Sequence, residues 1–150
     1  MRALRATLLA LTAMVALAAC GGYESESGLP ADTQKALIDQ GRIREGENVL
    51  FYTSRGEDIA EAGAFFTETR VAAYWLVDGD DEDISIDLKD ITALQLKNND
   101  DSWTHADYVT VTWGPDNQKT KVFLQSDGED FPEHFYEALK KQWEKTRAPA

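Results

Sequence analysis

The sequence predicts a mainly β domain, of the α+β class, that ends in one amphipathic helix. Seven short segments between residues 49 and 125 are rich in β-branched and aromatic residues, and turn signals separate them. After Asp130 the apolar residues no longer alternate with polar ones. They recur every three to four residues instead, which is typical of a helix. The chain has a single cysteine, so it can form no internal disulfide, and its stability must come from a hydrophobic core. We therefore expect about seven antiparallel strands closed by a C-terminal helix.

Residues 1–19 have the build of an export signal. Arg2 and Arg5 form a basic start, residues 8–17 form an apolar middle, and small residues follow. An uncleaved membrane helix is the alternative, but Arg5 and Thr12 interrupt a stretch that is shorter than the roughly 20 apolar residues of a span. We expect residues 1–19 to be a cleaved signal peptide.

The tetrapeptide Leu17-Ala18-Ala19-Cys20 resembles the lipobox of bacterial lipoproteins, in which the cysteine receives a diacylglyceryl group and the chain is cut before it. The resemblance covers residues 1–22. It implies lipidation of Cys20, acylation of the new amino terminus, and attachment to the cell envelope through these chains. Gly21 stands where an aspartate would signal inner-membrane retention. The outer membrane, facing the periplasm, is therefore expected in a Gram-negative host.

A flexible tether and a short helix are expected next. Residues 20–31 are rich in Gly, Ser and Glu, which is typical of a linker, and a linker this short keeps the domain near the bilayer. The folded domain is expected over residues 32–146, with a frayed tail at 147–150. Its first helix should be capped by Asp32, stop at Gly41, and dock through Leu37 and Ile38.

Seven strands are expected between this helix and the C-terminal one. The first covers residues 49–53, and strands 63–67 and 71–77 form a hairpin. The acidic run 78–83 is expected to be a turn, followed by a strand at 84–88 with Ile84, Ile86 and Leu88 facing inward. The remaining strands are expected at 91–97, 108–113 and 120–125, the last two joined by the turn 114–117.

The C-terminal helix has clear start signals. Asp130 suits the N-cap, and Glu133 three residues later completes a capping-box pattern. One stripe of the helix carries four large apolar residues, namely Phe131, Phe135, Leu139 and Trp143. This stripe is expected to face the core.

Seven strands followed by a helix is the order of elements in the pleckstrin-homology-like (PH-like) fold. The stretch 64–74, and the pattern at 84–91 after it, resemble bacterial PH-like and GRAM-type domains, and the resemblance covers about residues 47–145. It implies a small barrel of two packed antiparallel sheets with the helix at one open end, and a recognition module. An eight-stranded, lipocalin-like cup is the alternative, but the lack of an eighth predicted strand and the terminal helix argue against it. Phosphoinositide binding is not implied, because residues 54–62 hold one arginine among three acidic residues.

The expected mature chain is strongly acidic. Removing residues 1–19 removes two arginines and no acidic residue, which leaves 13 Lys and Arg against 27 Asp and Glu, a net charge of −14. Nucleic acid and anionic lipid repel such a surface, so we expect no nucleic-acid partner and a membrane contact only through the lipid on Cys20. An envelope protein of basic character is one expected partner. The alternative is that the acidity only keeps the domain soluble.

No short motif of a catalytic site, a metal site or a cofactor site is present. His105 and His134 belong to no metal-ligand spacing. The acidic run 78–83 could attract a cation, as could a cluster of Asp100, Asp101, His105 and Asp107. The acidic run lacks the spacing of an EF-hand loop. Charged loops are usually solvated, so solvated loops are the expected outcome for both. We predict no catalytic residue, no cofactor and no metal ligand.

Trp103 is the candidate partner-binding residue. It lies in the polar segment 98–107, where an exposed tryptophan could anchor a partner. The alternative is that its ring folds back on the barrel. The sequence therefore predicts a lipid-anchored envelope lipoprotein that acts as a non-catalytic interaction or scaffold module. The alternative function is a lipoprotein that binds a small ligand or a cation, and an enzyme ranks third.

Overall fold

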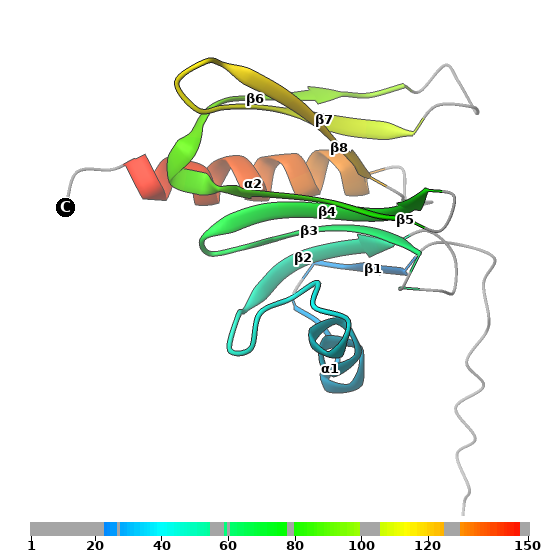
Figure 1. The fold of residues 1–150 in the computed structure, drawn as a ribbon. Coiled ribbons are helices and arrows are strands. Elements are labelled where there is room, and N and C mark those ends of the chain that lie inside the picture. Colours follow the sequence, from blue (N-terminus) through cyan, green and yellow to red (C-terminus); the bar gives the residue numbers. More distant parts are fainter. Residues whose placement is uncertain are drawn as a thin grey trace, which may run out of the picture.

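The computed structural model describes residues 23–26, 28–54, 59, 61–77, 80–99, 106–124 and 130–147. Within them lie eight antiparallel strands in two sheets, with the longest helix beside both (Figure 1). The elements are β1 (Tyr23–Ser25), α1 (Ala31–Asp39), β2 (Val49–Ser54), β3 (Ala62–Thr67), β4 (Arg70–Val77), β5 (Asp80–Asp87), the 3-10 helix η1 (Leu88–Asp90), β6 (Ile91–Lys97), β7 (Asp107–Trp113), β8 (Gln118–Leu124) and α2 (Phe131–Arg147).

The mainly β fold with antiparallel strands and a C-terminal helix is confirmed. Strands β1 to β5 form one sheet in chain order, and β6 to β8 form the other. The two sheets are separate hydrogen-bonded ladders, so they form a sandwich and do not close into one barrel. Both predicted hairpins are present, at residues 68–69 and at the turn 114–117.

Strand β1 was not expected, because it lies inside the segment predicted to be a tether. Tyr23 pairs with Ser54, and Ser25 pairs with Tyr52. A three-residue polar strand has no periodic pattern of its own, so only the partner strand β2 defines it. The predicted flexibility of residues 20–31 is therefore wrong at β1. Helix α1 begins at Ala31, one residue before the expected cap, and ends before Gly41, which has a φ of 74°.

Strand β5 begins earlier than predicted. Most of the acidic run expected to be a turn belongs to it, since Asp80 pairs with Val77 and Asp83 pairs with Tyr74. Pairing with the apolar strand β4 outweighs the weak strand preference of aspartate. Ile84 and Ile86 pack on the main core as predicted, whereas the strand ends before Leu88, which is buried in η1.

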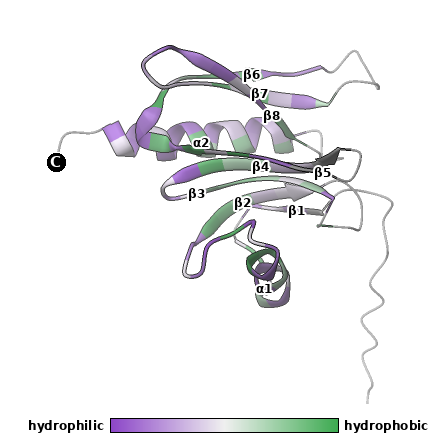
Figure 2. Cartoon of the chain, in the orientation of Figure 1, coloured by the Kyte–Doolittle hydropathy of each residue, from purple (hydrophilic) through white to green (hydrophobic). Residues whose placement is uncertain are grey.

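The main core lies between the two sheets and α2, which Figure 1 shows running between them. Phe135 is fully buried, and its ring lies edge-on to Phe66, with the ring centres 5.1 Å apart. Figure 2 shows hydrophilic and hydrophobic residues alternating along α2, as in an amphipathic helix. Of the predicted stripe, Phe131, Phe135 and Leu139 are buried, and Trp143 packs partly buried beside them.

A second, smaller core covers the opposite face of the five-stranded sheet. Helix α1 inserts Leu37 here, with Ile38 packed beside it, as predicted. The hydroxyl groups of Tyr52 and Tyr74 lie 2.8 Å apart, and that of Tyr74 also donates to the Ile59 carbonyl at 2.6 Å. A Cβ atom on Gly63 would lie 2.6 Å from the Tyr74 oxygen, so only glycine fits there.

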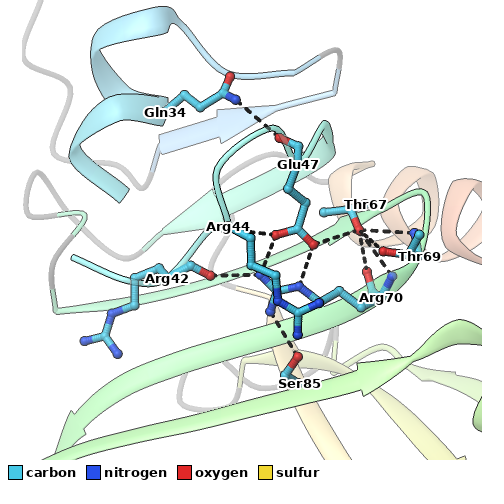
Figure 3. Close-up of polar contacts among 8 residues, drawn as sticks. All are labelled: Gln34, Arg42, Arg44, Glu47, Thr67, Thr69, Arg70 and Ser85. Carbon is cyan, nitrogen blue, oxygen red and sulfur yellow. Dashed lines mark hydrogen bonds and ion pairs between the residues drawn. The ribbon is translucent and has the colours of Figure 1, made fainter. Parts of the chain in front are cut away.

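A buried ion pair ties the loop after α1 to the β3–β4 hairpin (Figure 3). The Arg70 guanidinium donates to both carboxylate oxygens of Glu47, at 2.6 Å each. It also donates to the Ser85 hydroxyl and the Arg42 carbonyl, both at 3.0 Å. The side chains of Arg70 and Glu47 are only 5% and 9% exposed.

The environment of Glu47 favours its charged form. Burial by itself raises the pKa of this carboxyl, but several other effects outweigh it. These are the Arg70 hydrogen bonds, the Arg44 backbone N–H, which donates at 3.0 Å, and the positive charges of the two arginines. The pKa of Glu47 is therefore lowered, and its carboxylate is ionised at neutral pH.

Candidate functional site

The outward face of the three-stranded sheet carries the most distinctive surface chemistry of the described residues. The register aligns Lys97 with Tyr108, Tyr108 with Phe123, and Thr110 with Lys121. The alternate positions of these strands, such as Val109 and Val111, face the core. The outward set, here called the lysine face, is Ala93, Gln95, Lys97, Tyr108, Thr110, Thr112, Lys119, Lys121 and Phe123.

The charge of the lysine face is opposite to that of the chain. Its charged side chains are Lys97, Lys119 and Lys121, and no Asp or Glu projects from it within β6, β7 and β8. The chain as a whole has a net charge of −12. The sheet alternation therefore separates a basic surface from a predominantly acidic protein.

Two aromatic rings lie among these lysines. Phe123 is 43% exposed, which makes it the exposed large apolar side chain of the described residues. Its ring meets that of Tyr108 edge-on, with centres 5.5 Å apart, and the Lys121 ammonium lies 4.5 Å from the centre of the Tyr108 ring. A lysine over an aromatic ring is held by a cation–π attraction. Rings flanked by cations suit a partner that offers both carboxylates and apolar groups.

Strand β6 adds a second feature to this surface, because it borders the sheet. It pairs with β7 on one side, and the structure describes no strand on its other side. Thr92, Ala93, Gln95 and Lys97 are exposed along it. Its backbone could therefore pair with an extended segment of another polypeptide.

Most residues singled out by the sequence lie elsewhere. Cys20 and Trp103 lie outside the described residues, as do Asp100, Asp101 and His105. Of that predicted cluster, the structure places only Asp107, which begins β7 and accepts a hydrogen bond from the Asn99 backbone N–H at 2.7 Å. Within the described part of the chain, no group of three or more His, Cys, Asp or Glu residues is placed to hold a metal ion.

His134 lies on the surface of α2. Its Nδ1 lies 2.9 Å from a carboxylate oxygen of Glu26, in the segment that follows β1. The hydrogen bond to Glu26 and the charge of its carboxylate raise the pKa of His134 above its usual value. This pair links the start of α2 to the chain between β1 and α1.

Comparisons with protein-family models, with curated proteins and with solved structures find no match to this chain. Of the helices described, none is long and apolar enough to cross a membrane. The functional inferences below therefore rest on the residues and their geometry.

The sequence analysis did not predict the lysine face, although part of the pattern that forms it is visible in the sequence. Lys119, Lys121 and Phe123 alternate along the last strand, so all three must share one face. Lys97 and Tyr108 join them only through the pairing of β6 with β7, which a single sequence does not disclose.

Proposed function

We propose that the protein is a lipid-anchored docking module of the cell envelope, which binds an acidic segment of another polypeptide on its lysine face. The observation that carries the proposal is the grouping of three lysines and two aromatic rings on one sheet face. Aromatic side chains provide contact area, and cations select carboxylates. The strong net acidity of the chain favours a basic partner, but the local surface favours an acidic one.

A polypeptide suits this face better than an anionic membrane. Each lysine near an anionic bilayer contributes only about 1 kcal/mol, and a bilayer would also meet the acidic remainder of the domain. An extended acidic segment contacts only the face itself. It can also pair with the edge of β6 after Ile91, whose carbonyl already accepts a hydrogen bond from the Trp143 indole, and this pairing supplies backbone hydrogen bonds in addition to charge.

The anchor in this proposal is Cys20, and β1 limits how far the domain lies from it. Only Gly21 and Gly22 separate Cys20 from Tyr23, where the first sheet begins. Three residue steps span at most about 11 Å. A lipid on Cys20 would therefore hold the folded domain against the membrane, closer than a tether of twelve flexible residues would.

The anchor is tested by replacing the predicted lipid attachment site. In cells fed an alkyne-tagged fatty acid, the native chain is expected to incorporate the tag and Cys20→Ser to lose it. Labelling is expected to persist in Ser54→Ala, which leaves Cys20 intact. Equal labelling of Cys20→Ser and the native chain would show that Cys20 is not the anchor.

Docking is tested with a photoreactive benzoylphenylalanine at position 123. Irradiation of cells is expected to crosslink the chain to an acidic protein. The crosslinked band should weaken at least tenfold when Lys97→Glu and Lys121→Glu are added, because both cations become repulsive. Lys35→Glu is the matched control, since Lys35 is exposed on α1, away from this face. Crosslinks to lipid alone, or a band that withstands the charge reversal, would refute the proposal.

A further inference from the structure

Strand β2 and helix α2 line a groove of about 330 Å³. Its apolar lining, here called the floor, includes Leu50, Phe51, Phe66 and Ala138, and the polar side chains of Asn48 and Gln142 also line the groove. Its rim carries Lys141 and Lys145, which are both exposed. We propose that this groove binds a fatty acid, with the acyl chain on the apolar floor and the carboxylate at the two lysines. The inference does not depend on the docking function.

A β-bulge builds the floor of the groove. Val49 pairs with Thr67 and Phe51 pairs with Phe66, so Leu50 is an extra residue in β2. Without the extra residue, neighbouring side chains would point to opposite faces. The bulge instead lets both Leu50 and Phe51 pack against the main core, on the side of α2. The sheet thereby presents two adjacent apolar side chains at one place.

The floor is held in position by the aromatic core. The Phe51 ring stacks on Phe66, with centres 5.2 Å apart and planes only 12° from parallel. The same ring lies edge-on to Phe135, with centres 6.1 Å apart. An apolar surface that is already ordered loses little entropy when a ligand binds to it.

The charges along the groove favour one orientation of the ligand. Ala138 and Lys145 are seven residues apart on α2, which is about 10 Å along the helix axis. The acidic residue of the lining, Glu26, is bonded to His134, nearer the start of the helix. The cationic end is therefore at Lys141 and Lys145, where Lys145 donates to the Gln142 side chain at 3.2 Å. A carboxylate could replace that contact.

The size of the groove fits one acyl chain. Its volume of about 330 Å³ lies at the lower end of the roughly 300–1,000 Å³ typical of small-molecule sites. An acyl chain of medium length is therefore a suitable probe. Strand β1 pairs only with Tyr52–Ser54, so no described strand covers the first half of β2. The bulge there disfavours the addition of a peptide strand, which favours an amphiphile over a peptide.

The test uses the full-length chain in its membrane and a photoreactive dodecanoate with a diazirine near its methyl end. Irradiation is expected to label peptides from β2 and α2, and excess dodecanoate should compete while dodecanol should not. Lys141→Glu with Lys145→Glu should reduce labelling at least fivefold. Ala138→Phe, which fills the floor, should do the same with both lysines in place.

Lys140→Glu is the matched control, because it makes the same charge change on α2 outside the groove lining. Labelling of this variant should stay within twofold of the native chain. The lysine variants change exposed residues, so they remain informative if Ala138→Phe fails to fold. Three results would overturn the proposal. They are unchanged labelling in Lys141→Glu with Lys145→Glu, equal competition by dodecanol and dodecanoate, and no labelling of β2 and α2.

Discussion

Glu47→Ala is expected to lower the free energy of unfolding by about 3–5 kcal/mol, because it leaves the Arg70 guanidinium buried without its counter-charge. Arg70 is only 5% exposed, and both of its hydrogen bonds to Glu47 would be lost. Urea unfolding followed by circular dichroism measures the change. Replacing both members, in Glu47→Leu with Arg70→Met, should cost less than the sum of the single replacements, because neither charge is then left unpaired.

The control for this prediction is a surface ion pair of equally short distance. Lys35 and Asp39 are 2.6 Å apart on α1, but both side chains are more than half exposed. Lys35→Ala should cost no more than about 1 kcal/mol, since solvent weakens such pairs. Equal losses in Glu47→Ala and Lys35→Ala would show that burial of the Glu47–Arg70 pair has no energetic consequence.

The same pair makes stability depend on pH in a defined direction. Because folding lowers the pKa of Glu47, its contribution is fully present above the unfolded pKa, about 4.5, and is lost as the pH falls through the folded value. The difference in unfolding free energy between the native chain and Glu47→Gln should therefore be constant above about pH 5 and shrink below it.

Phe135→Ala is expected to destabilise the protein by about 3–5 kcal/mol, as large-to-small changes of buried aromatic residues do. The Phe135 side chain is fully buried and touches the rings of Phe51, Phe66 and Phe131. Its loss would open a cavity where α2 meets the five-stranded sheet. Urea unfolding should show a lower midpoint with little change in slope.

Phe123→Ala is the matched control, since it removes the same ring from the exposed sheet face. Phe123 is 43% exposed, so its replacement should cost less than about 1 kcal/mol. Similar losses in Phe123→Ala and Phe135→Ala would contradict the assignment of Phe135 to the core and Phe123 to the surface.

Local patterns predicted most of the fold correctly. Short stretches of sequence predict the turn at residues 68–69 and the helix after Asp130, and both are present. The errors fall where a segment takes its structure from a distant partner. β1 and the start of β5 have polar sequences, and pairing with β2 and β4 makes them strands.

The candidate sites were less predictable than the fold. The sequence drew attention to Cys20 and Trp103, which lie outside the described residues. The lysine face depends on which residues of β6, β7 and β8 stand side by side. The groove depends on one extra residue in β2 and on its meeting with α2. Neither relation is encoded in the spacing of nearby residues.

Local sequence alone accounts for the alternation of inward and outward residues, the terminal helix and the single cysteine of the proposed anchor. These properties are local, because side-chain direction follows from position along a strand or helix. Tertiary folding brings Glu47 into contact with Arg70, 23 residues away, and places Lys97 and Lys121 on one surface. Such meetings depend on strand register and packing, since these bring together groups that the chain keeps far apart.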